Sequence, residues 1–337
     1  MDRAIEFSVF PLAKGWTYPE LRAVALEAER LGFAALWQQD NIMGHVPYTP
    51  LGIPIFDTWP TLSALADATS KIRLGSLATP AVRRYPPLLA KTIACLDNIS
   101  NGRINVGLGA GDVEIHYTSI GQRFPPPAER VAILREAIEV MKLMWTQEFA
   151  TFRGEHFHIE NAMLNPKPVQ KPHPPVWVAS TRGTRLMPRV VAECADGVAI
   201  ECADDAIVAK VVQAIERNCE LLNRDMSEIT LARTSVLVFT NGTLDFNAVL
   251  QGLGRLFGFQ IADNWANVYE PVIFGTPSQI AEELHRRFVA FGFRHIVVYP
   301  YAVDLEVDTG DLSAGPGNFI GSMRMFAQEI MPLLAHK

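Results

Sequence analysis

The sequence predicts a closed (β/α)₈ barrel, in which eight parallel strands alternate with helices. Short β-rich apolar runs alternate with segments of helical periodicity along the chain, and such regular alternation favours a parallel sheet. Eight strand–helix units match the number that closes a barrel, and a chain of 337 residues is long enough for one. An open, doubly wound sheet is the alternative.

Each element is expected from its local pattern. Short apolar runs rich in β-branched and aromatic residues predict strands at 5–10, 34–39, 72–79, 104–111, 174–181, 197–203, 230–240 and 295–300. Apolar residues at helical spacing predict helices, the main ones at 18–33, 58–70, 86–100, 129–145 and 278–293. The segment 241–275 is rich in Gly and Asn and is predicted to be an insertion before the last unit. Residues 1–337 are therefore expected to form one domain.

The composition excludes several classes of protein. A formal net charge of −6 with scattered basic residues argues against a nucleic-acid partner. No apolar run approaches the roughly 18 residues of a membrane span, so no membrane partner is expected. The first residues lack a signal-peptide pattern, and the four cysteines have no CxxC spacing. A cytoplasmic protein with reduced thiols is expected.

Sequence motifs of common hydrolases and metalloenzymes are also missing. No GxSxG, HExxH or Walker loop is found, which argues against common hydrolases and NTPases. His156 and His158 alternate as metal ligands on a strand can. No third ligand lies nearby in the sequence, so a hairpin with solvated histidines and no metal is expected.

In such a barrel the active site lies at the carboxyl ends of the strands, which selects the polar residues just past each strand. The second strand is followed by Asp40, Asn41 and His45, and the third ends near Ser76. The fourth is followed by Asp112. The fifth and sixth strands end in the candidates Ser180, Thr181, Arg182, Gly183, Glu201 and Cys202.

The stretch NVGLGAGDVE has glycine at 107, 109 and 111, followed by Asp112. Glycine lets a backbone turn sharply or lets another group lie against it, so either a bulge or a flat ligand is expected here. The GxGxG spacing is a weak match to a nicotinamide-binding loop. Asp112 is a candidate acid, base or hydrogen-bond acceptor, and the alternative is that it caps the next helix.

The loop ASTRGTR joins the fifth strand to a helix and carries small, hydroxyl and glycine residues. Backbone N–H groups at such a turn bind anions, and Arg182 or Arg185 adds positive charge. A phosphate group fits this pattern. An ordinary loop with a Ser or Thr cap explains it equally well.

With these motifs, the chain resembles the luciferase-like flavin and deazaflavin oxidoreductases. The similar segments are EAERLGFAALWQQDN, the long run from ATSKIRLGSLATP to INVGLGAGD, PPVWVASTRGTRLMPRVVAECADGVAI, and FGTPSQIAEEL. They are spread over the whole chain and occur in the family's order. The resemblance implies the (β/α)₈ fold and a redox activity.

The family has two branches, one that binds FMN and activates oxygen, and one that binds coenzyme F420, a deazaflavin that carries hydride. The acid directly after the glycines resembles the F420 branch, as does the long loop after Asp40. The resemblance therefore implies coenzyme F420, with FMN as the alternative.

The resemblance also implies a role for each matching position. Asp40 would hydrogen-bond the deazaflavin edge, and a non-prolyl cis peptide would join Ser76 to Leu77 behind the central ring. Ala110 and Gly111 would approach the ring or its side chain. The phosphate would lie on Ser180, Thr181, Arg182 and Gly183, with Glu201 and Cys202 lining the same pocket.

Two positions depart from the relatives. Asn41 stands where some dehydrogenases of the family have a catalytic His, and an amide cannot relay a proton as imidazole does. His45 is therefore a candidate for the missing base. Asp112 replaces a commoner Glu and would protonate the substrate, in surroundings expected to be partly shielded from water.

The resemblance thus implies an F420-dependent reductase that transfers hydride to a C=O, C=C or C=N bond of a small substrate. An FMN-dependent monooxygenase and a non-catalytic flavin-binding protein are the alternatives. Aromatic residues in the 43–57 loop and in 241–275 suggest an apolar or aromatic substrate. A homodimer is expected because relatives are often dimers.

Overall fold

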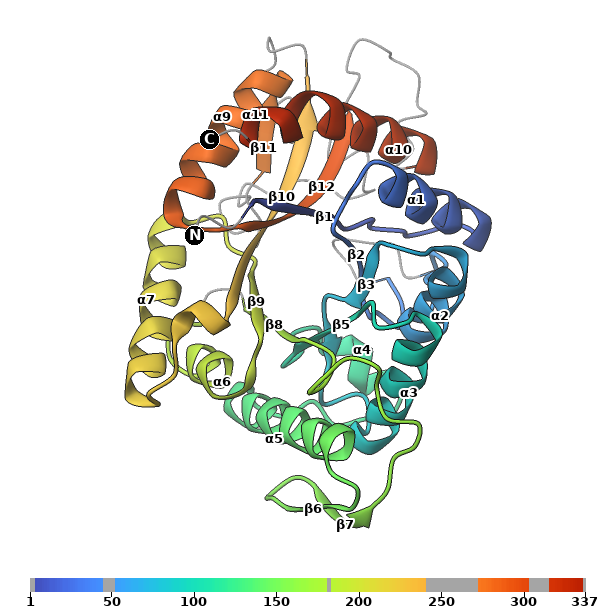
Figure 1. Ribbon diagram of the computed structural model, residues 1–337, viewed down its shortest axis with the longest axis vertical. Coiled ribbons are helices and arrows are strands. Elements are labelled where there is room, and N and C mark those ends of the chain that lie inside the picture. The colour runs from blue at the N-terminus through green and yellow to red at the C-terminus, as the bar shows by residue number, and fades with distance from the viewer. Residues whose placement is uncertain (1–3, 45–51, 181–182, 241–271, 303–314, 336–337) are drawn as a thin grey trace.

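The structure is a computed structural model that describes residues 4–44, 52–180, 183–240, 272–302 and 315–335. Eight parallel strands form a closed ring in the order β1-β2-β3-β5-β8-β9-β10-β12 (Figure 1). The ring closes because β12 pairs with β1 and β9 pairs with β10. The barrel strands are β1 Glu6–Val9, β2 Ala35–Gln38, β3 Arg73–Ser76, β5 Ile104–Gly109, β8 Val176–Ser180, β9 Gly197–Ile200, β10 Thr230–Phe239 and β12 His295–Ala302.

Helices surround this ring on the outside (Figure 1). They are α1 Tyr18–Arg30, α2 Thr58–Ala68, α3 Pro86–Ile99, α4 Ile115–Thr118, α5 Pro127–Thr146, α6 Met187–Cys194, α7 Asp205–Leu221, α9 Pro277–Arg287, α10 Pro316–Met325 and α11 Met331–Ala335. Two 3₁₀ helices are η1 Met226–Glu228 and η3 Val289–Phe291, and a π-helix, η4 Phe326–Ile330, joins α10 to α11. No helix in the described ranges is both long and apolar enough to cross a membrane.

All eight predicted strands are present in the predicted order, so the (β/α)₈ barrel is confirmed. The third is interrupted: β3 ends at Ser76, and β4, Thr79–Pro80, continues the pairing with β5. The last predicted helix is shorter than 278–293, because α9 ends at Arg287 and the 3₁₀ turn η3 follows.

The predicted insertion 241–275 is described only at its end. Residues 241–271 lie outside the described ranges, and Val272–Gly275 forms β11, which pairs with Val236–Phe239 of β10 on the edge opposite β12, beyond the part of that edge that pairs with β9. A predicted hairpin is also confirmed: β6 Ala150–Arg153 and β7 His158–Ala162 are antiparallel, and His158 is exposed.

Glycines make room for two tryptophans inside the barrel. The rings of Trp37 and Trp177 pack edge to face with centroids 5.3 Å apart. A Cβ on Gly75 would lie 2.7 Å from the Trp37 ring, and one on Gly197 would lie 2.6 Å from the Trp177 ring. The barrel interior around these two tryptophans is therefore a packed core. Ligands are expected only at the carboxyl ends of the strands.

The structure also brings a histidine of β12 to a serine and a carboxylate of β1, far from it in the sequence. The Nε2 of His295 lies 2.7 Å from the Ser8 hydroxyl, and its Nδ1 lies 3.1 Å from a Glu6 carboxylate oxygen. Ser8 is fully buried and His295 is 3% exposed. Since substrate cannot reach this hydroxyl, the contact satisfies buried polar groups of the core.

Candidate active site

The candidate site lies at the carboxyl ends of the barrel strands, where three half-buried alanines next to Gly109 form a set that we call the alanine floor. Ala78 follows β3, Ala110 follows β5 and Ala179 is the fourth residue of β8. Each is half-buried and packs against the core. A Cβ on Gly109 would lie 3.4 Å from the Ala78 Cβ and 4.0 Å from the Ala179 Cβ, so Gly109 lies between these two alanines. A surface of such small residues leaves room for a flat ring.

The three glycines of the GLGAG stretch have different roles. A Cβ on Gly107 would lie 1.8 Å from the backbone oxygen of Ser76, and one on Gly111, with φ of 79°, would lie 1.7 Å from the Tyr117 hydroxyl. Two of the glycines therefore accommodate the protein itself. Only Gly109, whose neighbours are small side chains, fits the expectation that glycine makes room for a ligand.

The non-prolyl cis peptide joins Leu77 to Ala78, one residue later than the Ser76–Leu77 position that the resemblance implied. The Leu77 N–H donates to the Gln38 carbonyl at 2.7 Å, so the Ser76–Leu77 peptide still belongs to the ladder with β2. The Ser76 hydroxyl donates to the Gly107 carbonyl at 2.7 Å. Ser76 and Leu77 are both buried. The cis peptide lies between the end of β3 and the start of β4.

Asp40, which follows β2, is 2% exposed and paired with two arginines of the β4–α3 loop. Arg84 donates Nε and Nη2 to its two carboxylate oxygens at 2.8 and 2.7 Å, and Arg83 lies 2.8 Å from the same group. Arg84 also pairs with Asp57 at 3.0 Å. Burial disfavours the Arg84 charge, but the hydrogen bonds and charges of both carboxylates raise its pKa above the usual value.

This arrangement changes the expectation for Asp40 and for the densest basic pair of the sequence. Arg83 and Arg84 are neutralised by carboxylates and are not a free anion site. The predicted hydrogen bond from Asp40 to a cofactor edge stays a prediction, because each carboxylate oxygen can accept a second bond.

The residues after Asp40 are only partly described. Asn41 is half-buried and donates to the Gln39 side chain at 3.1 Å. His45 lies outside the described residues, so its role as a base stays a prediction. His116 is 2% exposed, and its Nε2 lies 3.0 Å from the Met43 carbonyl. His116 therefore holds the start of the 43–57 loop through the Met43 carbonyl.

Asp112 is exposed at the carboxyl end of β5. It does not cap α4, whose N-cap residue is Glu114. The described residues leave Asp112 accessible to a substrate, and the expected shielding from water stays a prediction. Nearby, burial raises the pKa of the Tyr117 hydroxyl to about 12, so this phenol stays protonated at neutral pH.

The predicted phosphate loop begins in a buried position. Ser180 is 1% exposed, and among the described residues its hydroxyl has no hydrogen-bond partner. Gly183 is exposed, and Thr181 and Arg182 lie outside the described residues. The Glu201 N–H donates to the Ser180 carbonyl at 2.9 Å. A buried, unpaired hydroxyl at this turn suits a loop that binds an oxyanion.

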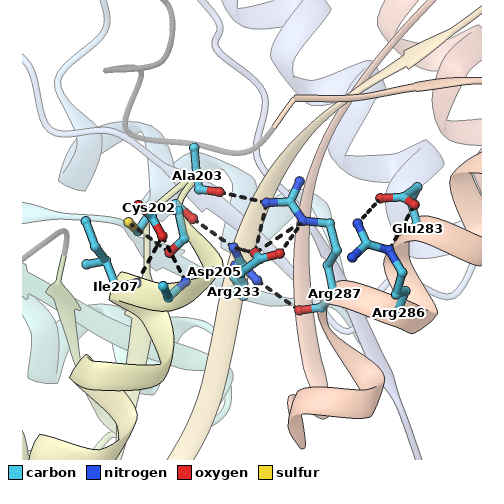
Figure 2. Close-up of polar contacts among 10 residues, drawn as sticks. Cys202, Ala203, Asp205, Ile207, Arg233, Glu283, Arg286 and Arg287 are labelled. Carbon is cyan, nitrogen blue, oxygen red and sulfur yellow. Dashed lines mark hydrogen bonds and ion pairs between the residues drawn. The ribbon is translucent and has the colours of Figure 1, made fainter.

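The wall beyond β9 contains a charged cluster that sequence reasoning missed (Figure 2). Asp205, the first residue of α7, accepts from Arg233 of β10 at 2.6 Å and from Arg287 of α9 at 2.9 Å. Burial works against the Asp205 charge, but the two arginines lower its pKa below the ordinary value. A charge in the apolar strand TLARTSVLVF was the signal, because a buried arginine requires a partner.

Cys202 is fully buried, and its Sγ lies 3.7 Å from the Asp204 carbonyl oxygen. Among the described residues, no group of three or more His, Cys, Asp or Glu side chains is placed to hold a metal ion.

Comparisons with known proteins place this chain in a family. Residues 5–245 match the family model described as luciferase-like monooxygenase. Because this match covers most of the chain, the protein belongs to the luciferase-like family, as the sequence motifs predicted.

Two curated relatives are named F420-dependent glucose-6-phosphate dehydrogenase. The protein of Kineococcus radiotolerans is 32% identical over 168 residues, which are 48% of this chain and 46% of the relative. The protein of Intrasporangium calvum is 27% identical over 316 residues, covering 83% of this chain and 88% of the relative. The matched segments span about half the length of the first curated relatives, at 46% and 48%.

The fold is also similar to a solved structure described as an F420-dependent secondary alcohol dehydrogenase in complex with an F420–acetone adduct. The TM-score is 0.79 over 98% of this chain and 99% of the other, at 18% sequence identity. At this identity the similarity supports the barrel fold alone.

Proposed function

We propose that this chain is a coenzyme F420-dependent oxidoreductase that transfers hydride between the deazaflavin and a C=O, C=C or C=N bond of a small organic substrate. The observation that carries the proposal is the floor of Ala78, Ala110 and Ala179 around Gly109, with exposed Asp112 beside it. The names of the relatives in the luciferase-like family support the coenzyme.

The residues present fit this coenzyme. The alanine floor suits a flat, largely apolar ring, and the unpaired Ser180 hydroxyl suits a phosphate oxygen. When bound, the reduced deazaflavin supplies the hydride. Asp112 then donates a proton to the substrate atom that does not receive the hydride, or accepts it in the oxidative direction.

The same proposal includes an apolar or aromatic substrate. It also includes a homodimer that has neither a nucleic-acid nor a membrane partner. The aromatic residues that the sequence has in 43–57 and 241–275 support the apolar or aromatic substrate. The description of the family as monooxygenases favours one second candidate, an FMN-dependent monooxygenase.

A titration of the purified protein with F420 and with FMN, followed by fluorescence, tests the coenzyme. We expect saturable binding of F420 and at least about tenfold weaker binding of FMN. Tighter binding of FMN, with oxygen consumption by the reduced complex, would instead establish the monooxygenase. Binding of F420 without turnover on a panel of carbonyls, enones and imines would indicate a non-catalytic binding protein.

The variant Asp112→Asn tests the proton donor. We expect turnover to fall by about 10²–10⁴-fold, the usual contribution of a positioned acid, with F420 affinity unchanged. Glu114→Gln is the matched control, because Glu114 is also exposed and lies two residues further on. Equal turnover in the two variants would remove Asp112 from the mechanism.

A further inference from the structure

The β9–α7 connection, residues 201–204, is held from outside by two arginines (Figure 2). Arg287 donates Nη2 to the Ala203 carbonyl at 2.7 Å, and Arg233 donates Nη2 to the Cys202 carbonyl at 3.0 Å. The same two guanidinium groups bind the Asp205 carboxylate. Consecutive residues of this short connection therefore depend on two cations from β10 and α9.

The arginines are themselves fixed in place. Arg233 is fully buried, donates Nη1 to the Arg287 carbonyl at 2.8 Å and lies over the Phe288 ring at 4.7 Å. Arg287 binds Asp205 through both Nε and Nη2. Two positive charges face one carboxylate, which cannot accept from all of their N–H groups. The backbone carbonyls accept from N–H groups of the two arginines as well.

This connection touches the predicted phosphate loop. The Glu201 N–H donates to the Ser180 carbonyl, so the end of β9 sets the position of the end of β8. The start of α7 offers no competing anion site, because the Asp204 carboxylate accepts from the N–H groups of Ala206 and Ile207 at 2.8 and 3.2 Å. A shift of residues 201–203 would therefore reach the pocket through Ser180.

We infer that Asp205, Arg233 and Arg287 are positioning residues that hold the Glu201–Ala203 wall against Ser180, the residue at which the predicted phosphate loop begins. None of the three side chains needs to touch the coenzyme. The wall-holding role follows from the contacts alone, and its effect on coenzyme affinity rests on the proposed function.

The inference is tested by comparing the variant Arg287→Ala with the control variant Arg286→Ala. Arg286 is the next residue back on α9, pairs only with Glu283 among the described contacts and is 62% exposed in its side chain, so its loss controls for a missing surface charge (Figure 2). Two readouts apply to the full-length protein. The first is the rate at which a maleimide labels Cys202, measured on the peptide by mass spectrometry. The second is the dissociation constant for F420.

We expect Arg287→Ala to raise both the Cys202 labelling rate and the F420 dissociation constant about tenfold, the usual effect of losing a charge-assisted hydrogen bond. Arg286→Ala should match the wild type in both. Arg287→Lys should recover only part of the affinity, because an ammonium cannot reproduce the guanidinium fork.

Should Arg287→Ala fail to fold, Asp205→Asn gives the same two readouts while keeping the side-chain volume. Unchanged labelling in the folded variant would overturn the inference that the cluster holds the wall. Faster labelling with unchanged F420 affinity would overturn the inference that the wall positions the coenzyme site. If the wild type binds no F420, the proposed function falls, whereas the labelling ratio still decides whether the cluster holds the wall.

Discussion

Opposite sides of the barrel mouth carry clusters of the same composition, one aspartate between two arginines, with different dependence on their members. Asp40 follows β2 with its side chain 1% exposed, and Arg84 shares its charge with a second carboxylate, Asp57. Asp205 begins α7 with its side chain 28% exposed, and there the fully buried member is Arg233. The buried Asp40 carboxylate is therefore the group of the first cluster that depends most on its partners. In the second cluster it is the buried Arg233 guanidinium.

The comparison shows that one ion-pair motif can do two things. Around Asp40 the charges balance, and the cluster joins the end of β2, the β4–α3 loop and the start of α2. Around Asp205 one positive charge is in excess, and the spare donors hold backbone carbonyls. The first cluster mainly joins side chains and holds one backbone carbonyl, that of Asp40 itself, through Arg83, whereas the second holds the carbonyls of two consecutive residues outside the ion pair, Cys202 and Ala203.

The largest expected effect is on stability at the first cluster. Asp40→Asn leaves the buried Arg83 guanidinium without its counter-charge, and we expect the free energy of unfolding to fall by about 3–5 kcal/mol. Asp205→Asn should cost about 1–2 kcal/mol, because water reaches part of that site. Urea denaturation of both variants measures the difference, and equal losses would contradict the distinction between the clusters.

When an arginine is removed instead, we expect the second cluster to lose more stability than the first. Arg233→Met keeps much of the volume but leaves the Cys202 and Arg287 carbonyls without their donor, for an expected loss of about 2–3 kcal/mol. Arg83→Met should cost about 1–2 kcal/mol, because Arg84 still binds both Asp40 oxygens. Thermal denaturation of the two variants measures which loses more stability. A larger loss for Arg83→Met would contradict the greater dependence of the second cluster on its buried arginine.

The smallest effect concerns pH. The pKa of Asp205 is lowered in the folded protein, so the native state binds fewer protons than the unfolded chain, and the stabilisation is lost on acidification. The stability difference between wild type and Asp205→Asn should be constant from about pH 7 to pH 5 and shrink below about pH 4, where carboxylates begin to be protonated. Denaturation curves at three pH values check this, and a gap that widens in acid would be inconsistent with it.

The strands were predictable because their signal is local. Each barrel strand is a short apolar run, and the (β/α)₈ order follows from their alternation. The cis peptide was placed one residue early, since motif resemblance identifies the bulge but not which N–H continues the β2 ladder. That detail depends on the contact between Leu77 and Gln38.

The Asp205 cluster could not be read from spacing. Its members are 28 and 82 residues apart from Asp205 in the sequence, and they meet because the register places Arg233 beside Ile200 at the end of β9. The clamp on Asp40 was missed for a related reason, because Arg83 and Arg84 resemble any exposed basic pair until their burial is known.

A crystal structure of the protein with F420 bound tests the central claim most directly. The account predicts the deazaflavin ring on the floor of Ala78, Ala110 and Ala179, with the Asp112 carboxyl on the open side. It also predicts a phosphate oxygen within hydrogen-bond distance of the Ser180 hydroxyl. A coenzyme bound away from this floor, or a ring with Asp112 far from its exposed face, would contradict the account.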